Sequence, residues 1–205
     1  IYQSLLGQLT GFEAINASLY DRSTCLYEDF LCAQRLIKNS TTVVVAGSLY
    51  PGDLEVIETH AADTGLKIVR APVDAATGTL DLKKLETLLG SGVAALAFPQ
   101  INALGNLEDV DALTDLCAAR GVKSIAVVDP MFLTELKPPI QYGAKGADMV
   151  VAEGQHLALG PNFGGPGLGI FGIRYNETDK NSIRATAGRY VGKTVDNQGR
   201  ECKAL

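Results

Sequence analysis

The chain has 205 residues, of which 46% are hydrophobic and 20% charged, and its formal net charge is −5. This length and composition predict a soluble α/β protein with a sizeable core, and the lack of a basic cluster argues against nucleic-acid binding. No apolar run reaches membrane-spanning length and no signal peptide opens the sequence, so we expect a cytoplasmic chain without membrane contact. Four scattered cysteines without a Cys-x-x-Cys pair predict reduced, mostly buried thiols, and two histidines offer little for a metal site.

The spacing of apolar residues predicts alternating helices and strands along the chain. Helices are expected at residues 1–10, 51–64 and 80–89. Two more are expected, one after the possible cap at 21–24 with apolar positions at 26, 30, 31 and 36, and one after the loop 99–105 with the acidic residues 108, 109 and 111 in its first turn. Continuous apolar runs predict buried strands at 41–46, 66–71, 93–98, 123–128, 149–152 and 168–173. Strands joined by helices imply right-handed crossovers and a mostly parallel sheet, with 168–173 as the antiparallel exception because no obvious helix precedes it. After Asn176 the sequence predicts polar, irregular chain.

Polar residues follow two of the predicted strands, where open α/β sheets usually bind ligands. Asp129 ends one strand and precedes a proline, so it is a candidate partner for a cationic ring nitrogen, although capping a loop is the commoner use. His156 follows the next strand beside Gln155 and has no acidic partner near it in the sequence. A hydrogen-bonded loop histidine is therefore the simpler interpretation than a catalytic base.

Two further loops are candidates for ligand contact. The segment Asp21-Arg22-Ser23-Thr24 can cap a helix or offer its backbone N–H groups to a phosphate. Tyr50 follows a strand and can either stack on a flat ligand or cover the sheet. The glycine string at 164–169 precedes a predicted strand, whereas a dinucleotide-binding fingerprint precedes a helix, so we reject a dinucleotide site there.

The order of these loops and strands resembles the large domain of fold type I pyridoxal-phosphate enzymes. More closely, the chain resembles the P-protein family of the glycine cleavage system, glycine dehydrogenase (decarboxylating), in its subunit 1 (alpha) form. The matching positions are segments 14–21, 128–130, 146–151, 153–155, 164–169 and 188–192, with Asn102, Gly105, Glu108, Asp109, Thr194 and Asp196. They occur in the family's order over nearly the whole chain.

The resemblance implies a three-layer α/β/α fold with a mostly parallel mixed sheet and one antiparallel strand. It also implies that residues 1–205 are a single large domain, without the family's N-terminal region and small C-terminal domain. Tyr50, Asn102, Asp129 and His156 are the implied cofactor-binding positions, which a chain of this kind retains in weak or vestigial form. The chain departs from the family's usual residues at Arg22, Ser23, Tyr50 and 101–104.

Gln155 falls where the catalytic half of the family carries its Schiff-base lysine. A glutamine amide has no basic amine that can condense with an aldehyde, so no catalytic residue is expected in this chain. Lys145 and Lys193 are the other lysines considered, and neither lies at that place in the sequence.

The leading hypothesis is a non-catalytic alpha subunit of a glycine decarboxylase. The family then implies a beta subunit that holds the pyridoxal phosphate and a lipoyl carrier protein (H-protein) that receives the aminomethyl group. One alternative is an active pyridoxal-phosphate lyase or transferase that uses another lysine. A second alternative is a doubly wound module that binds a nucleotide or sugar phosphate.

Overall fold

The computed structural model describes the whole chain except residues 17, 161, 177, 179–181, 188–191 and 205. Its main body is a seven-stranded sheet with the order β1-β7-β6-β5-β4-β2-β3. The strands are β1 (Ala14–Ile15), β2 (Thr42–Ala46), β3 (Lys67–Ala71), β4 (Val93–Pro99), β5 (Lys123–Val128), β6 (Met149–Glu153) and β7 (Gly169–Ile173). Neighbouring strands from β3 to β6 pair in parallel, whereas β7 is antiparallel to both β6 and β1. The predicted mixed sheet with one antiparallel strand is confirmed.

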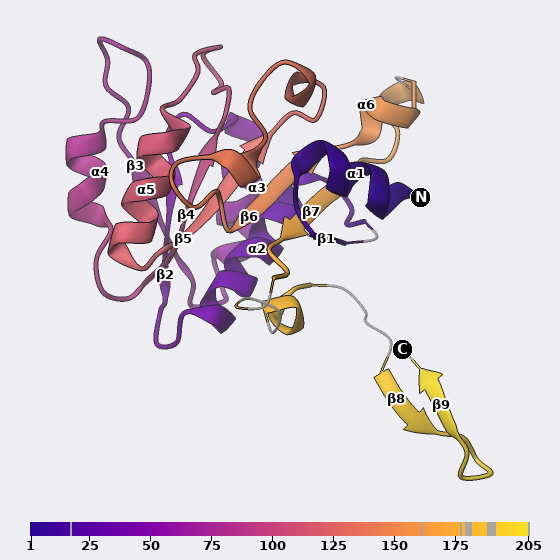
Figure 1. Cartoon of the computed structure of the whole chain (residues 1–205). Helices are drawn as coiled ribbons and strands as arrows, with labels where there is room; N and C mark the ends of the chain where they lie inside the picture. The colour runs from indigo at the N-terminus through magenta and orange to yellow at the C-terminus, as the bar shows by residue number, and fades with distance from the viewer. Residues whose placement is uncertain (17, 161, 177, 179–181, 188–191, 205) are drawn as a thin grey trace.

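Helices cover both faces of this sheet (Figure 1). They are α1 (Tyr2–Thr10), α2 (Arg22–Leu36), α3 (Pro51–Ala61), α4 (Leu82–Leu88), α5 (Val110–Arg120) and the short α6 (Gln155–Ala158). The helix α2 packs against α3 and against β4, β6 and β7, while α5 packs against β4 and β5. The connection from β2 to β3 contains α3, and the connection from β3 back past β2 to β4 contains α4. Because right-handed crossovers that run in opposite directions along a sheet place their helices on opposite faces, α3 and α4 lie on different layers. The result is the expected α/β/α arrangement.

The central strands have the continuous apolar sequence that a sheet covered on both faces requires. All seven residues of β4 are buried, as are the last five residues of β5. Cys25, Cys32 and Cys117 are buried free thiols and Cys202 is half-buried, so the prediction that the cysteines are mostly buried is confirmed. In the part of the chain that the structure describes, no helix has the length and apolar character to cross a bilayer.

Several local predictions were wrong. The segment after β6 contains α6 and a single 3₁₀ turn, η3 (Asn162–Gly164), where the sequence showed no helix. The strand β1 has only two residues, which is too short to give a periodic signal. The chain after Asn176, expected to be irregular, contains η4 (Ser182–Ala185) and a hairpin of β8 (Gly192–Val195) and β9 (Glu201–Ala204). Residues 188–191 of the family-like segment 188–192 lie outside the described residues.

Candidate active site

Two of the candidate residues meet at the carboxyl edge of the sheet. Asp129 follows β5 and His156 lies in α6 after β6, and because these strands are parallel neighbours their ends lie side by side. The Nε2 atom of His156 lies 3.1 Å from Oδ1 of Asp129, and both side chains are about two-fifths exposed. Oδ1 of Asp129 also accepts a hydrogen bond of 2.9 Å from the backbone N–H of Met131. The acidic partner that the sequence near His156 lacks is thus supplied by a residue 27 positions earlier.

Gln155 is the first residue of α6 and is held by two hydrogen bonds. Its backbone N–H donates to Oε1 of Glu153 at 2.9 Å, and its side-chain amide donates to the carbonyl oxygen of Gly164 at 3.1 Å. Lys145 precedes β6 and lies with Lys123 and Arg174 in a hollow at the opposite, amino edge of the sheet. The side chain of Lys193 is not among those that the structure describes.

The helix α2 starts at the same carboxyl edge. Asp21 is its N-cap and accepts a 2.8 Å hydrogen bond from the backbone N–H of Thr24, so the predicted capping is confirmed. Arg22 makes a bidentate ion pair with the buried Asp53 of α3, at 2.9 and 3.2 Å. The hydroxyl group of Ser23 donates to the same carboxylate at 2.6 Å.

Glu153 joins three segments of this edge through backbone N–H groups. Its carboxylate accepts hydrogen bonds from Arg22 at 3.2 Å, from Gln155 at 2.9 Å and from Leu168 at 2.7 Å. These donors belong to the start of α2, the start of α6 and the chain entering β7. Glu153 was not singled out as a candidate, and the only sequence signal for it is an acidic residue at the end of an apolar strand.

Tyr50 lies beside this cluster, with its ring facing another side chain. The guanidinium carbon of Arg22 lies 4.5 Å from the centre of the Tyr50 ring, a distance at which cations are attracted to aromatic faces. The Tyr50 hydroxyl group donates to the carbonyl oxygen of Ile101 at 3.4 Å. One ring face that the sequence offered to a flat ligand is therefore covered by the chain's own arginine.

Asn102 is separated from this cluster and is almost fully buried in the loop after β4. Its amide nitrogen donates to the carbonyl oxygen of Gly78 and to Oε1 of Glu108, at 2.8 and 2.9 Å. Its amide oxygen accepts from the backbone N–H groups of Leu104 and Asn106. Since these bonds use the full hydrogen-bonding capacity of the amide, the geometry favours a structural function for Asn102.

Glu108 is the centre of that second network, although the sequence predicted that it belongs to the acidic first turn of a helix. It is buried and lies just before α5, whose N-cap is Asp109. It accepts hydrogen bonds from the Ser48 hydroxyl group at 2.7 Å and from the Leu80 backbone N–H at 2.8 Å, besides the one from Asn102. These bonds join the loops that follow β2 and β4, the two neighbouring strands at which the strand order reverses.

No activated thiol serves this edge. Cys25 lies one turn into α2, and burial, reinforced by the nearby carboxyl groups of Asp29 and Asp21, holds the pKa of its thiol well above its usual range. A protonated, buried thiol is a poor nucleophile. Among the residues that the structure describes, no three His, Cys, Asp or Glu side chains come together as ligands for a metal ion.

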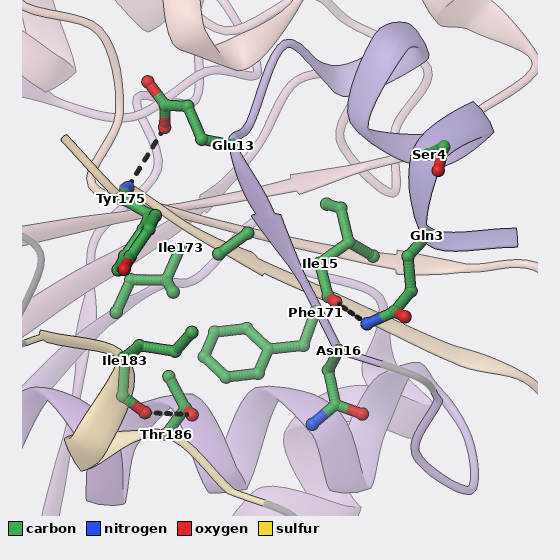
Figure 2. A pocket seen from close by; sticks show the side chains of 11 residues that line it. Gln3, Ser4, Glu13, Ile15, Asn16, Phe171, Ile173, Tyr175, Ile183 and Thr186 are labelled. Carbon is green, nitrogen blue, oxygen red and sulfur yellow. Dashed lines mark hydrogen bonds between the residues drawn. The ribbon is translucent and has the colours of Figure 1, made fainter. Parts of the chain in front are cut away.

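Two hollows flank the sheet near β1 and β7. One, of about 550 Å³, lies beside the start of α2 and is lined by Tyr20, Asp21 and residues 166–168. The other, of about 430 Å³, lies against β1 (Figure 2), where Ile15, Phe171 and Ile173 form an apolar wall. Glu13, the one acidic residue that lines this second hollow, accepts a hydrogen bond from the backbone N–H of Tyr175. The second hollow is therefore large enough for a small molecule, but we assign no reaction to the residues that line it.

The arrangement of helices and strands first defines the fold class of this protein. The mostly parallel mixed sheet with helices on both faces has the fold of the large domain of fold type I pyridoxal-phosphate enzymes, and the apo structure of the cysteine desulfurase of Thermococcus onnurineus has a similar fold. That structure has a TM-score of 0.68 and 20% identity, over 96% of this chain and 47% of the desulfurase. At this identity the likeness shows the fold alone.

The family follows from closer matches. A crystal structure of glycine decarboxylase (P-protein) has a TM-score of 0.80 and 33% identity, over 100% of this chain and 44% of that one. The probable glycine dehydrogenase (decarboxylating) subunit 1 of Thioalkalivibrio sulfidiphilus is 39% identical over 97% of this chain. The family model for the glycine cleavage system P-protein matches residues 1–205, and the chain belongs to this family. It spans 44% of the length of the Thioalkalivibrio relative.

Proposed function

We propose that this chain belongs to the non-catalytic alpha subunit of a glycine decarboxylase, in which residues 1–205 form one large domain. Family membership supports the reaction, and Gln155 supports the non-catalytic role. The observation that carries the proposal is the position of Gln155, directly after β6 and at the same edge as Asp129. This is the place to which the family resemblance assigns a lysine, and an amide cannot form a Schiff base.

The residues at this edge do not fit a covalently bound pyridoxal phosphate. Asp129 has the carboxylate that a pyridine nitrogen needs, but it is already paired with His156 and Met131. Lys145 lies at the other edge of the sheet, which removes the main support for the alternative that this chain is itself an active lyase. We therefore assign no catalytic step to this chain.

The proposed assembly contains a beta subunit that holds the pyridoxal phosphate. In the cytoplasm the complex decarboxylates glycine and passes the aminomethyl group to the lipoyl carrier protein, H-protein. The name of the relatives, subunit 1, supports the existence of a second subunit. The alpha chain contributes apolar surface to the contact between subunits and shapes the entrance to the partner's site.

Exposed apolar side chains on the loops at the carboxyl edge support this structural role. Met131 and Phe132 follow β5 and are about half exposed, and Phe163 lies fully exposed after α6. Phe163 also has φ 53°, a left-handed conformation that is uncommon for a bulky residue. Apolar groups gathered at one edge favour contact with another protein surface.

The test compares the full-length alpha chain alone with the same chain co-expressed with a lysine-bearing beta subunit. Pyridoxal absorbance and exchange of the glycine carboxyl group are expected only in the presence of the beta subunit. Borohydride reduction followed by peptide mapping should place the cofactor on a partner lysine, and Lys145→Ala in the alpha chain should change nothing. A borohydride-fixed cofactor on a lysine of the alpha chain would overturn the proposal.

A further inference from the structure

The first turn of α2 is surrounded by carboxylates of the chain itself. Asp21 binds the backbone N–H of Thr24 at 2.8 Å, and Glu153 binds that of Arg22 at 3.2 Å. Asp53 accepts the hydroxyl group of Ser23 at 2.6 Å. The backbone N–H groups of Arg22 and Thr24, which a helix start would offer to an external anion, are therefore already bound to internal anions.

The charge balance of this turn is unfavourable for a further anion. Three carboxylates, those of Asp21, Asp53 and Glu153, stand against the guanidinium group of Arg22. That guanidinium is tied to Asp53 by a bidentate pair and covers the ring of Tyr50. Asp53 is nearly inaccessible to solvent, with a side-chain exposure of 4%, so its charge is screened less than that of a surface group.

A phosphate approaching this helix start would have to displace the Glu153 carboxylate and lie close to the other two. In this partly buried environment, the repulsion between a phosphate and the neighbouring carboxylates would be strong. Introducing an amine at position 155 alone, in place of the Gln155 amide, would leave this repulsion in place.

We propose that the alpha chain excludes phosphate-bearing ligands from its cofactor edge through the carboxylates of Asp53 and Glu153, independently of the missing lysine. The inference rests on the proposed non-catalytic role and deepens it, because it identifies a second barrier to the cofactor. This edge then differs from a working cofactor site in two ways. It lacks the lysine that forms a Schiff base, and its carboxylates repel the phosphate group.

The experiment compares pyridoxal with pyridoxal 5′-phosphate in the full-length alpha chain without its partner. The first variant is Gln155→Lys, and the second adds Asp53→Asn and Glu153→Gln, which preserve shape and remove negative charge. Binding is followed by absorbance and by borohydride fixation mapped to position 155. The ratio of the two dissociation constants isolates the contribution of the phosphate, because both compounds carry the same aldehyde and ring.

In Gln155→Lys we expect pyridoxal phosphate to bind no tighter than pyridoxal. In the triple variant we expect the phosphate compound to gain about tenfold or more over pyridoxal, which corresponds to about 1.4 kcal/mol per factor of ten. Adding Glu55→Gln and Asp63→Asn, two exposed changes on and just after α3, to Gln155→Lys serves as the charge-matched control and should leave the ratio unchanged. Equal ratios in the first and triple variants, or no binding by a folded triple variant, would overturn the inference.

A second measurement applies if a lysine variant does not fold. Inorganic phosphate should leave the melting temperature of the wild-type chain unchanged relative to chloride at equal ionic strength, and should raise that of Asp53→Asn/Glu153→Gln. Equal stabilisation of both proteins would contradict the charge barrier. Failure of the charge barrier is distinguishable from failure of the proposed function, which would instead show as a covalent adduct at a lysine of the wild-type chain.

Discussion

At the scale of single residues, Asp29 is the most unusual group in the chain. It lies in the middle of α2, is fully buried, and neither carboxyl oxygen has a hydrogen-bond partner among the described residues. Burial raises the pKa of its carboxyl group well above the usual range, and the nearby Glu28 raises it further. The folded domain therefore holds the proton of Asp29 to a higher pH than the unfolded chain does, because an unpaired charge in a dry interior is costly.

This proton makes the stability of the domain dependent on pH. The unfolded chain releases it near the ordinary aspartate pKa of about 3.9, whereas the folded chain retains it to a higher pH. The folded state then binds more protons, so the free energy of unfolding should fall as the pH rises above about 4. Asp29→Asn cannot titrate and should flatten this slope.

The measurement is urea unfolding of both proteins at several pH values from about 4 to about 8. Asp63→Asn, an exposed position after α3, is the control and should keep the wild-type slope. Parallel stability curves for the wild type and Asp29→Asn would show that Asp29 ionises normally in the folded state.

At the scale of elements, the glycine string before β7 sets how closely α2 approaches the sheet. A Cβ atom on Gly169 would lie 2.5 Å from the carbonyl oxygen of Asp21 and 3.1 Å from Cβ of Cys25. One on Gly167 would lie 2.8 Å from Cβ of Asp21. These glycines therefore serve the close packing of two chain segments, and it is this packing that brings Glu153 within reach of the α2 start.

Gly169→Ala should displace the start of α2 and destabilise the domain by roughly 1–3 kcal/mol, the usual cost of forcing extra volume into a packed site. Urea unfolding provides the free energy, and near-ultraviolet circular dichroism reports on local packing. Gly90→Ala is the matched control, because its added methyl group meets no atom within 4 Å, and its stability should change little. A Gly169→Ala protein as stable as Gly90→Ala would disprove the close-approach explanation.

At the scale of the whole molecule, the apolar loops at the carboxyl edge are the proposed contact with the beta subunit. Phe132 is 48% exposed in the single 3₁₀ turn η1 (Phe132–Thr134), directly after the Asp129 loop. Phe132→Asp places a charge in the proposed contact with the beta subunit and should weaken association by about tenfold or more, as loss of an aromatic contact typically does. Size-exclusion chromatography and titration calorimetry with the beta subunit provide the measurement.

Thr87→Asp, at an exposed position on α4, is the control because that helix covers the sheet away from these loops (Figure 1). It adds the same charge and should leave association unchanged. Identical affinities for the two variants would place the subunit contact elsewhere on the molecule.

Much of the fold could be predicted because buried strands and helices have recognisable patterns of apolar residues in the sequence. A strand covered on both faces needs a continuous apolar run, so β2, β4, β5 and β6 were found within one or two residues of their observed bounds. Helix starts were equally readable, since Asp21 and Pro51 are typical of the positions that they occupy. The two-residue β1 and the β8–β9 hairpin were missed because neither has a distinctive period or apolar content.

By itself, then, the sequence determined the mostly parallel sheet, the family and the amide at position 155, which are local or ordered along the chain. Only the tertiary structure decided which side chains meet at the carboxyl edge. His156 contacts Asp129, which lies 27 residues away in the sequence, and Arg22 pairs with Asp53, 31 residues away. Glu153 binds the backbone N–H of Arg22 over a sequence separation of 131 residues. Such pairings depend on the order of strands in the sheet and on how closely α2 packs, and no apolar pattern encodes either.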